Sequence, residues 1–221
     1  MLWIILCIAY TGLNTINEHI ILRHDPILLL ILGIILTIAL IFPTLIWMLK
    51  TQRNYAKVKF SLKHRIILVI VGIVLMSIFG NIEIGSTSQV TNDHIIDDVI
   101  HSGNTGLTFM ILAVLIGPIM EEFLCRFMII GPNPIGERYI HKWIYFIRIL
   151  IGSVIFALLH LTPNLITGNL SDIGQMLLGV APQLEAGLIL AYLYVHTQDI
   201  RVSIFTHVIY DLIGVIIIFI V

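Results

Sequence analysis

Long apolar stretches alternate with short polar segments along almost the whole chain. A helix needs about 20 mostly apolar residues to cross the roughly 30 Å of hydrocarbon in a membrane. Seven stretches approach this length. We therefore predict a bundle of seven membrane-spanning helices, at residues 2–22, 26–49, 64–82, 107–130, 147–168, 173–196 and 202–221.

The composition agrees with a membrane protein and excludes a soluble one. Hydrophobic residues make up 58% of the 221 residues and charged residues only 11%, whereas soluble domains carry about 25% charged residues. No internal repeat, low-complexity tract or soluble domain interrupts the pattern. The sequence therefore predicts a single all-α membrane domain, with no feature that indicates nucleic-acid binding.

The basic residues predict how the chain is oriented. Six of the twelve Lys and Arg residues lie in the linker at 50–65, whereas the segment 83–106 contains none. Basic loops between spans are usually cytoplasmic, so the linker and Arg201 are expected inside and the segment 83–106 outside. We expect an integral, multi-pass protein of a bacterial cell membrane, with the lipid bilayer as its surroundings.

Three of the predicted spans contain clusters of ionisable side chains. A charge at bilayer depth is costly, so such residues usually face a polar interior and have partners. Three spans with this feature indicate one shared site inside the bundle. The residues are Glu121, Glu122 and Arg126 in the fourth span, His160 in the fifth, and His207 with Asp211 in the seventh.

Helical spacing suggests a role for each residue of the first cluster. Glu122 and Arg126 are four residues apart, so they share a helix face and can form an ion pair. Glu121 points about 100° away and is left without that partner. We therefore predict that Glu121 is a general base that activates water, while Glu122 and Arg126 hold the helix in place.

The two histidines admit two chemistries. His207 and Asp211 are four residues apart, so the aspartate can orient the imidazole and fix its tautomer. Glu121, His160 and His207 could together hold a divalent metal such as zinc that polarises a carbonyl and generates hydroxide. Alternatively no metal binds, and the histidines stabilise the developing oxyanion by hydrogen bonds.

The depth of His160 predicts the course of its helix. Arg148 can extend its side chain to the membrane interface, so the span is expected to begin there, with residues 137–147 along the cytoplasmic surface. The helix would then continue past His160 through a kink at Pro163, which places the histidine near the middle of the membrane.

The sixth predicted span contains two further features. Glu185 is expected either to line the substrate cavity or to pair with Arg148 or with a backbone group that Pro182 frees. Gly187 and Ala191 form a small face four residues apart, which predicts a close helix contact.

Three short motifs, in this order, resemble those of a known family. They are E-E-x-x-x-R from Glu121, F-x-x-x-H from Phe156 and H-x-x-x-[ND] from His207. Their order and placement on three spans resemble the CAAX-protease and bacteriocin-processing family, also called Abi. The resemblance implies a catalytic core at 107–221, which follows N-terminal helices and an outer loop at 1–106.

The resemblance also implies a function. Members are polytopic intramembrane endopeptidases, often with eight spans, so a bundle of seven to eight transmembrane helices is expected. Prenylated-protein processing, peptide maturation and bacteriocin self-immunity are implied roles, with a membrane-associated protein or peptide as substrate. Glu121 would activate water, with or without a metal, while His160, His207 and Asp211 support the reacting oxygen.

Two positions differ from the family pattern, and two other protein classes fit the same residues. Phe127 follows Arg126 where glycine is usual, and Asp211 stands where asparagine is common. A non-catalytic membrane immunity or binding protein on the same scaffold is one alternative. A proton-coupled transporter is the other, although the two matching half-repeats typical of that class are absent.

Overall fold

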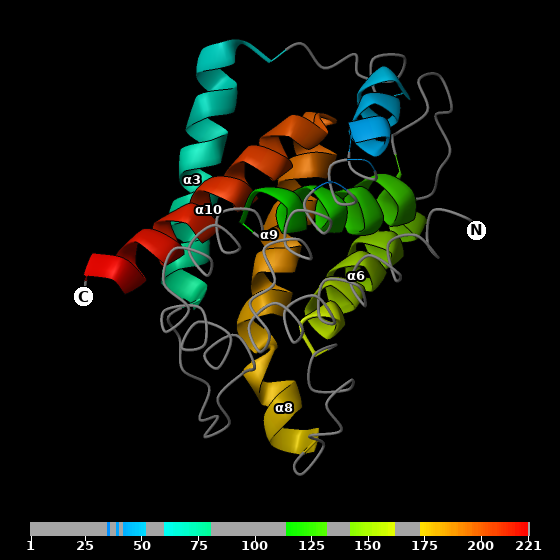
Figure 1. Ribbon diagram of the computed structural model, residues 1–221. Coiled ribbons are helices and arrows are strands. Elements are labelled where there is room, and N and C mark those ends of the chain that lie inside the picture. Colours follow the sequence, from blue (N-terminus) through cyan, green and yellow to red (C-terminus); the bar gives the residue numbers. More distant parts are fainter. Residues whose placement is uncertain are drawn as a thin grey trace.

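The described part of the chain is entirely helical. The computed structural model describes residues 35, 39, 42–51, 60–80, 114–131, 142–161 and 173–220, and none of these residues forms a strand (Figure 1). The all-α prediction is confirmed over these ranges. Besides helical residues at 42–51 and 114–122, the elements are α3 (Leu62–Gly80), η1 (Phe123–Ile130), α6 (Lys142–Leu159), α8 (Ile173–Gly179), α9 (Ala181–Thr197) and α10 (Ile200–Ile220).

Three described helices are long and apolar enough to cross a membrane, at Leu62–Gly80, Met176–Thr197 and Ile200–Ile217. They correspond to the third, sixth and seventh predicted spans. The first predicted span, most of the second, the beginning of the fourth and the loop at 83–106 lie outside the described residues. The total number of spans therefore stays a prediction.

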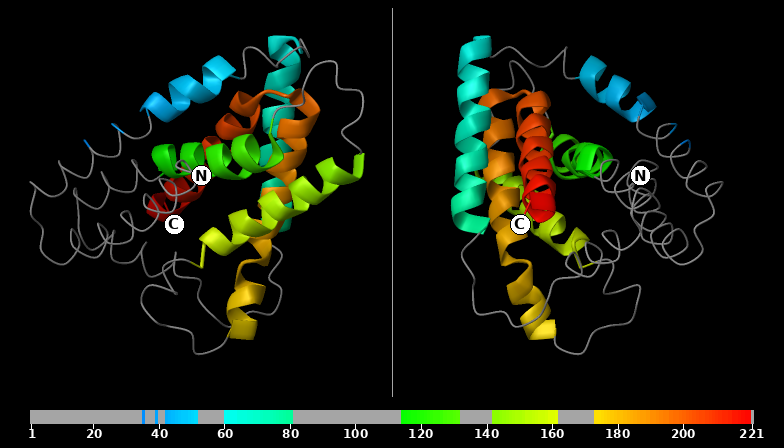
Figure 2. Two further views of the ribbon diagram at one scale, coloured as in Figure 1. Left: turned by 90° about the vertical axis from the view of Figure 1, so that its right-hand side faces the viewer. Right: turned by 60° about the vertical axis from the view of Figure 1, so that its left-hand side comes forward.

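Helix α9 occupies the centre of the described bundle. It packs against α6, α3 and α10, while η1 packs against α6 (Figure 2). Residues buried along α9 include Leu190, Ala191 and Tyr194. Because α9 contacts three other helices, it brings segments far apart in the sequence around one interior.

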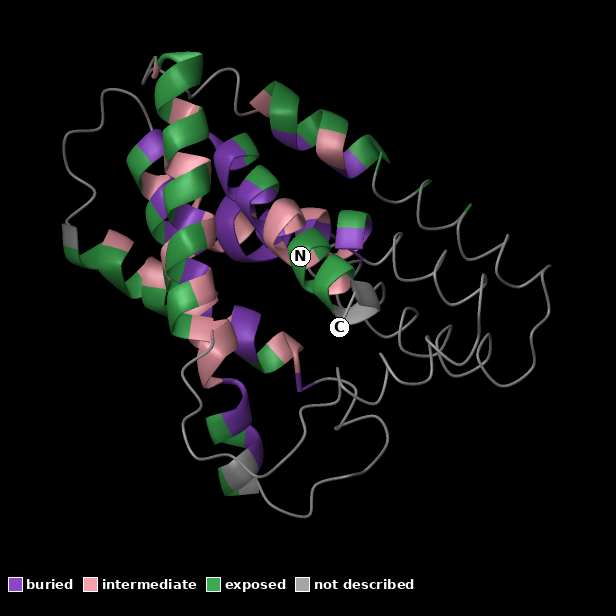
Figure 3. Ribbon diagram, turned by 90° about the vertical axis from the view of Figure 1, so that its left-hand side faces the viewer, coloured by how far each residue is buried: buried purple, intermediate pink, exposed green. Residues whose placement is uncertain are grey.

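Helix α3 leaves one face exposed (Figure 3), and the side chains on that face are apolar and form a ridge. Its only buried residues are Gly72 and Met76, and side chains at every fourth position of the opposite face are exposed. Such a continuous apolar surface is unfavourable in water and marks contact with lipid. The exposed residues of this ridge are Ile66, Ile70, Val74 and Ile78.

Two glycines allow α6 to approach its neighbours closely. A Cβ on Gly187 of α9 would lie 3.2 Å from both Cα and the carbonyl oxygen of Ser153. A Cβ on Gly152 of α6 would lie only 2.7 Å from the carbonyl oxygen of Cys125 in η1. The close helix contact predicted at Gly187 is confirmed, and α6 is held between η1 and α9.

Helix α6 begins earlier than the predicted membrane boundary at Arg148. It starts at Lys142 and continues through Arg148 without a break, and the position of the boundary along it stays a prediction. Residues 142–147 thus belong to the same helix, and residues 137–141 lie outside the described ranges. Tyr145 packs against the bundle core, which stabilises this additional turn.

The end of α6 corrects the prediction that the helix continues past His160. The helix ends at Leu159, and His160 lies in a turn. The N–H of His160 donates to the carbonyl of Ala157 (3.2 Å), and its ring Nδ1 lies 2.9 Å from the carbonyl oxygen of Phe156. The ring of His160 thus contacts the Phe156 carbonyl that its own backbone N–H would bond in an α-helix, which accompanies the end of the helix.

Arg148 caps η1 and does not pair with Glu185. Its Nη1 donates to the carbonyl of Ile130 at 3.2 Å, which satisfies a carbonyl at the end of that helix. Within the described part of the chain, Glu185 forms no ion pair, and its buried Oε2 has no hydrogen-bond partner there. Of the two expectations for Glu185, only the cavity-lining one stays open.

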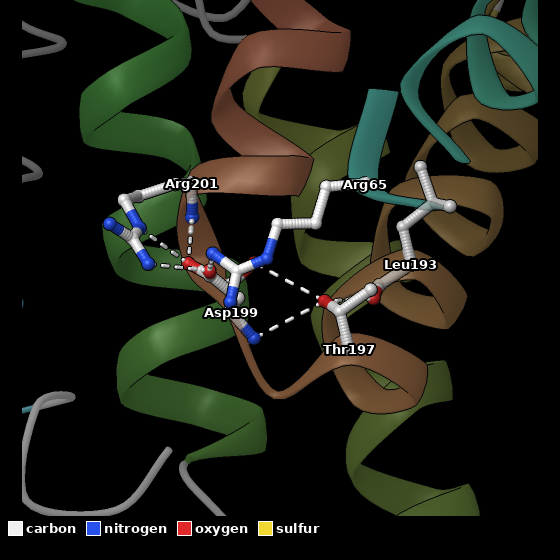
Figure 4. A network of polar contacts seen from close by, with 5 residues as sticks. All are labelled: Arg65, Leu193, Thr197, Asp199 and Arg201. Atoms are coloured by element: carbon white, nitrogen blue, oxygen red, sulfur yellow. Dashed lines mark hydrogen bonds and ion pairs between the residues drawn. The ribbon is translucent and has the colours of Figure 1, made fainter. Parts of the chain in front are cut away.

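The turn between α9 and α10 joins three helices through Asp199 (Figure 4). The carboxylate of Asp199 forms ion pairs with Arg65 from the start of α3 and with Arg201 from the start of α10. Its backbone N–H donates to the hydroxyl of Thr197 at 3.2 Å. Arg65 and Arg201, both predicted on the cytoplasmic side, therefore lie at the same end of the bundle.

The pKa of Asp199 lies below its ordinary value. Burial raises this pKa, but the hydrogen bonds and charge of Arg201 and the charge of Arg65 outweigh burial. A carboxylate with a lowered folded-state pKa stabilises the fold fully above its unfolded pKa of about 4, and this contribution is lost as pH falls through the folded value.

We predict that Asp199→Asn destabilises the protein in a pH-dependent way. At neutral pH the loss of a charged hydrogen-bond acceptor is expected to cost about 1–3 kcal/mol. The difference from wild type should shrink as pH falls below about 4, because the wild-type carboxylate is then protonated as well. Thermal unfolding in detergent at a series of pH values measures this, and a pH-independent difference would contradict it.

We also predict that Gly152→Ala destabilises the fold by about 1–3 kcal/mol, because the added methyl meets a backbone carbonyl that cannot move aside. The matched control is Gly214→Ala in α10, where a Cβ has nothing within 4 Å. There the substitution should be neutral or stabilise by up to about 1 kcal/mol, since alanine favours a helix. Equal denaturation midpoints for the two variants would refute the close contact.

Candidate active site

Two adjacent glutamates lie where the helix at 114–122 passes into η1, in very different surroundings. The side chain of Glu122 is completely buried, whereas that of Glu121 is 27% exposed. The π-helical turn that follows has its hydrogen bonds five residues apart, as between the N–H of Gly131 and the carbonyl of Arg126. Turns of this kind often occur at functional sites.

Three side chains fix the carboxylate of Glu122. Arg126 Nη1 lies 3.2 Å from Oε1, which confirms the predicted ion pair. The hydroxyl of Ser203 donates to Oε2, and Nδ1 of His207 lies 3.3 Å from Oε1. Oε2 of Glu122 is therefore hydrogen-bonded, whereas Oε1 lies at ion-pair distance from Arg126 and His207 without a hydrogen bond among the described residues.

Arg126 connects η1 to two other helices. Its guanidinium is completely buried, and Nη2 donates to the carbonyl of Gly187 in α9 at 3.0 Å. It also lies over the ring of Phe156 in α6, 4.5 Å from the centroid. A planar guanidinium can make all these contacts at once, whereas a lysine ammonium cannot.

His207 lies among three carboxylates. Its Nε2 is 3.7 Å from Oε2 of Glu121 and 3.6 Å from Oδ2 of Asp211, while Nδ1 faces Glu122. The ring of Phe156 packs edge-on against it, with the centroids 5.4 Å apart. The predicted proximity of His207 and Asp211 is confirmed, but Glu122 lies closer to the ring than Asp211 does.

His160 also packs against Phe156. The two ring centroids are 5.0 Å apart, and His160 also interacts electrostatically with Asp211. Because a carbonyl oxygen can only accept, the contact with the Phe156 carbonyl places the proton on Nδ1 of His160. In the neutral ring, Nε2 then carries the lone pair.

The structure thus brings all six predicted residues to one region and adds residues that the sequence analysis missed. Ser203 lies four residues before His207 on the same face of α10, so helical spacing alone could have indicated it. The role of the Gly187 carbonyl has no comparable sequence signal, because every residue carries a carbonyl. Phe156 appeared only as the first letter of a motif, yet it contacts Arg126, His160 and His207.

The arrangement does not fit a bound metal ion. Over the ranges described, no group of three or more His, Cys, Asp or Glu side chains is placed to hold one. Within these ranges the set of Glu121, His160 and His207, considered above as ligands, is therefore not gathered around a common centre. The Nδ1 contacts of the two histidines do not decide this, because histidines that bind a metal through Nε2 make the same contacts.

Comparison with known families gives this site a context. Residues 103–213 match the family described as Type II CAAX prenyl endopeptidase Rce1-like, and this range covers half of the chain and all six residues. The chain belongs to this family of proteases. The resemblance seen in the three motifs is thereby confirmed. The chain shows no match to a curated protein or to a solved structure.

We predict that Arg126→Lys destabilises the protein by about 1–3 kcal/mol, since a lysine keeps the charge opposite Glu122 but leaves the buried carbonyl of Gly187 without its donor. Arg148→Lys is the matched control, because Arg148 lies at the edge of the bundle and donates a hydrogen bond to a single carbonyl. Chemical denaturation of both variants in detergent provides the comparison. A loss for Arg126→Lys no larger than that for Arg148→Lys would show that the guanidinium contacts contribute little.

Proposed function

We propose that this protein is an intramembrane endopeptidase in which Glu121 activates water to hydrolyse a peptide bond. The difference between the two adjacent glutamates carries this proposal. The two oxygens of Glu122 lie at hydrogen-bond or ion-pair distance from Arg126, Ser203 and His207. Glu121 is partly exposed, and within the described ranges its ion-pair contact is with His207 at 3.7 Å, so of the two glutamates it is the one that a water molecule can reach.

In the proposed reaction, Glu121 accepts a proton from water while the oxygen forms a bond to the carbonyl carbon of the substrate. The carbonyl π electrons move to oxygen and form an oxyanion. When this intermediate collapses, the carbon–nitrogen bond breaks, and the proton held by Glu121 passes to the leaving amine. Such proton transfer by a positioned side chain contributes about 10²–10⁴-fold in rate.

The other residues support the oxyanion and the base. Both ring nitrogens of His207 lie near carboxylates, so we assign His207 an N–H that donates to the oxyanion. Stabilisation of an oxyanion in this way can contribute more to the rate than any other single effect. Asp211 and Glu122 orient the ring of His207, and His160, which packs against Phe156 and interacts with Asp211, is assigned a place beside the reacting group. Membership of a protease family supports the proposed mechanism, but it does not by itself assign these roles to the residues.

The proposed substrate is a membrane-associated protein or peptide. We place the site in a bundle of seven to eight transmembrane helices, with the core at 107–221 following N-terminal helices at 1–106, in a bacterial cell membrane. CAAX-type processing, peptide maturation and bacteriocin self-immunity are the roles consistent with the family. The three described spans and the apolar ridge of α3 support a location within lipid.

We predict that Glu121→Gln lowers kcat by about 10²-fold or more, because the amide keeps the shape of the side chain but cannot accept the proton. Its unfolding midpoint should stay near that of wild type, since Glu121 is partly exposed. Glu122→Gln should lower stability as well as activity, because it removes the charge opposite Arg126. Cleavage of a library of quenched peptides, with and without a prenyl group, in proteoliposomes measures the rates.

The control variant is His196→Gln, an exposed histidine of α9 that should leave the rate unchanged. Wild-type rates in Glu121→Gln would favour the non-catalytic binding role instead. Each reaction is repeated with a chelator and then with added zinc. A rate that is lost with chelator and restored by zinc would contradict the metal-free mechanism.

A further inference from the structure

The polar residues of α10 follow one another at intervals of four. Ser203, His207 and Asp211 lie on one face of the helix, and Asp199, which precedes the helix, continues the same series. Residues four apart lie above one another on a helix. Asp199 thus lies at the base of the strip whose next two members contact Glu122 and Glu121.

The side chain of Asp199 makes more polar contacts than are needed to form the turn. Its side chain is only 3% exposed, and Oδ1 accepts from the backbone N–H (3.1 Å) and Nε (2.8 Å) of Arg201. Oδ2 accepts from Nη2 of Arg201 (2.8 Å) and from Nη1 of Arg65. The backbone contact caps the first turn of α10, whereas the contact with Arg65 connects α10 to a helix more than 130 residues earlier.

Helices α3 and α10 also make a second contact, which lies the same number of residues beyond the first contact in both helices. Gly72 follows Arg65 by seven residues, and Thr206 follows Asp199 by seven residues. A Cβ on Gly72 would lie 2.8 Å from Cγ2 of Thr206. Helices α3 and α10 therefore touch at two points two turns apart, and the second point is adjacent to His207.

We propose that Asp199, fixed by Arg65, is a positioning residue that sets the register of α10 against α3 and so places His207 between the carboxylates. The proposal rests on the proposed function, because it assigns Asp199 an effect on the same reaction. His207 lies about 12 Å along the helix from Asp199, at 1.5 Å per residue. A rigid helix transmits a shift at its base directly to that ring.

The decisive comparison is between Arg65→Ala and Arg201→Ala. Arg65→Ala removes the contact that joins two helices, whereas Arg201 is 55% exposed and contacts Asp199 only within the same turn. We expect Arg65→Ala to lower kcat by about tenfold or more with KM within about twofold, as small displacements of a catalytic group do. Arg201→Ala should keep kcat within about twofold of wild type. Rates are measured in proteoliposomes at 25 °C, below the unfolding midpoint of each variant.

Two further variants separate positioning from stability. Arg65→Lys keeps a cation within reach of Asp199 and should recover part of the lost kcat. Asp199→Asn keeps an acceptor for the N–H of Arg201 but removes the charge that faces Arg65. Asp199→Asn and Arg65→Ala together should therefore lower kcat no more than the stronger single variant, since both interrupt the same contact.

Hydrogen exchange provides a readout that does not depend on activity. In Arg65→Ala, backbone N–H groups at 200–207 should exchange faster than in wild type, whereas α9 should be unchanged. Arg201→Ala should show the smaller effect. Exchange rates at 200–207 that are identical in wild type and Arg65→Ala would overturn the proposal.

The outcomes distinguish this inference from the proposed function. If wild type cleaves peptide, Glu121→Gln does not, and Arg65→Ala keeps wild-type kcat, the inference alone is overturned. It is likewise overturned if Arg201→Ala loses as much kcat as Arg65→Ala. If wild type cleaves no peptide, the proposed function fails, and the catalytic effect assigned to Asp199 fails with it.

Discussion

The buried ion pair between Glu122 and Arg126 is the interaction on which the arrangement of the site depends. Two charges removed from water are stable only when their geometry is good and further hydrogen bonds satisfy the remaining groups. Here Ser203 from α10 and the carbonyl of Gly187 from α9 each form one hydrogen bond with the pair, and the ring of Phe156 from α6 covers the guanidinium. The pair therefore connects η1 to three helices.

This constraint also explains how two adjacent carboxylates acquire different properties. Glu122 is buried and contacts other side chains of the bundle, whereas its neighbour Glu121 faces His207 from a partly exposed position. A protease that uses water needs one carboxylate with access to solvent and a fixed geometry around it. A fully buried charge beside a partly open one meets both requirements within a single turn.

The sequence was most informative where helical periodicity and the cost of buried charge act together. The Glu122–Arg126 pair and the shared site followed from spacing and from charges placed in apolar helices. The end of α6 was predicted wrongly, because the ring of His160 contacts the carbonyl that its backbone N–H would bond in an α-helix, and the sequence pattern does not reveal this contact. Some contacts depend on backbone atoms or on helices that are distant in the sequence, such as the contact of Asp199 with Arg65. The residue pattern of a single segment cannot predict these contacts.

The wide turn of η1 carries a consequence for how this site tolerates change in length. Its backbone makes room for one more residue per turn than an α-helix does, and Arg126 lies inside that stretch. Deleting a single residue there would let the segment tighten into ordinary α geometry and rotate the guanidinium away from Gly187. The number of residues in η1, whatever side chains they carry, thus determines whether the guanidinium of Arg126 can contact two helices at once.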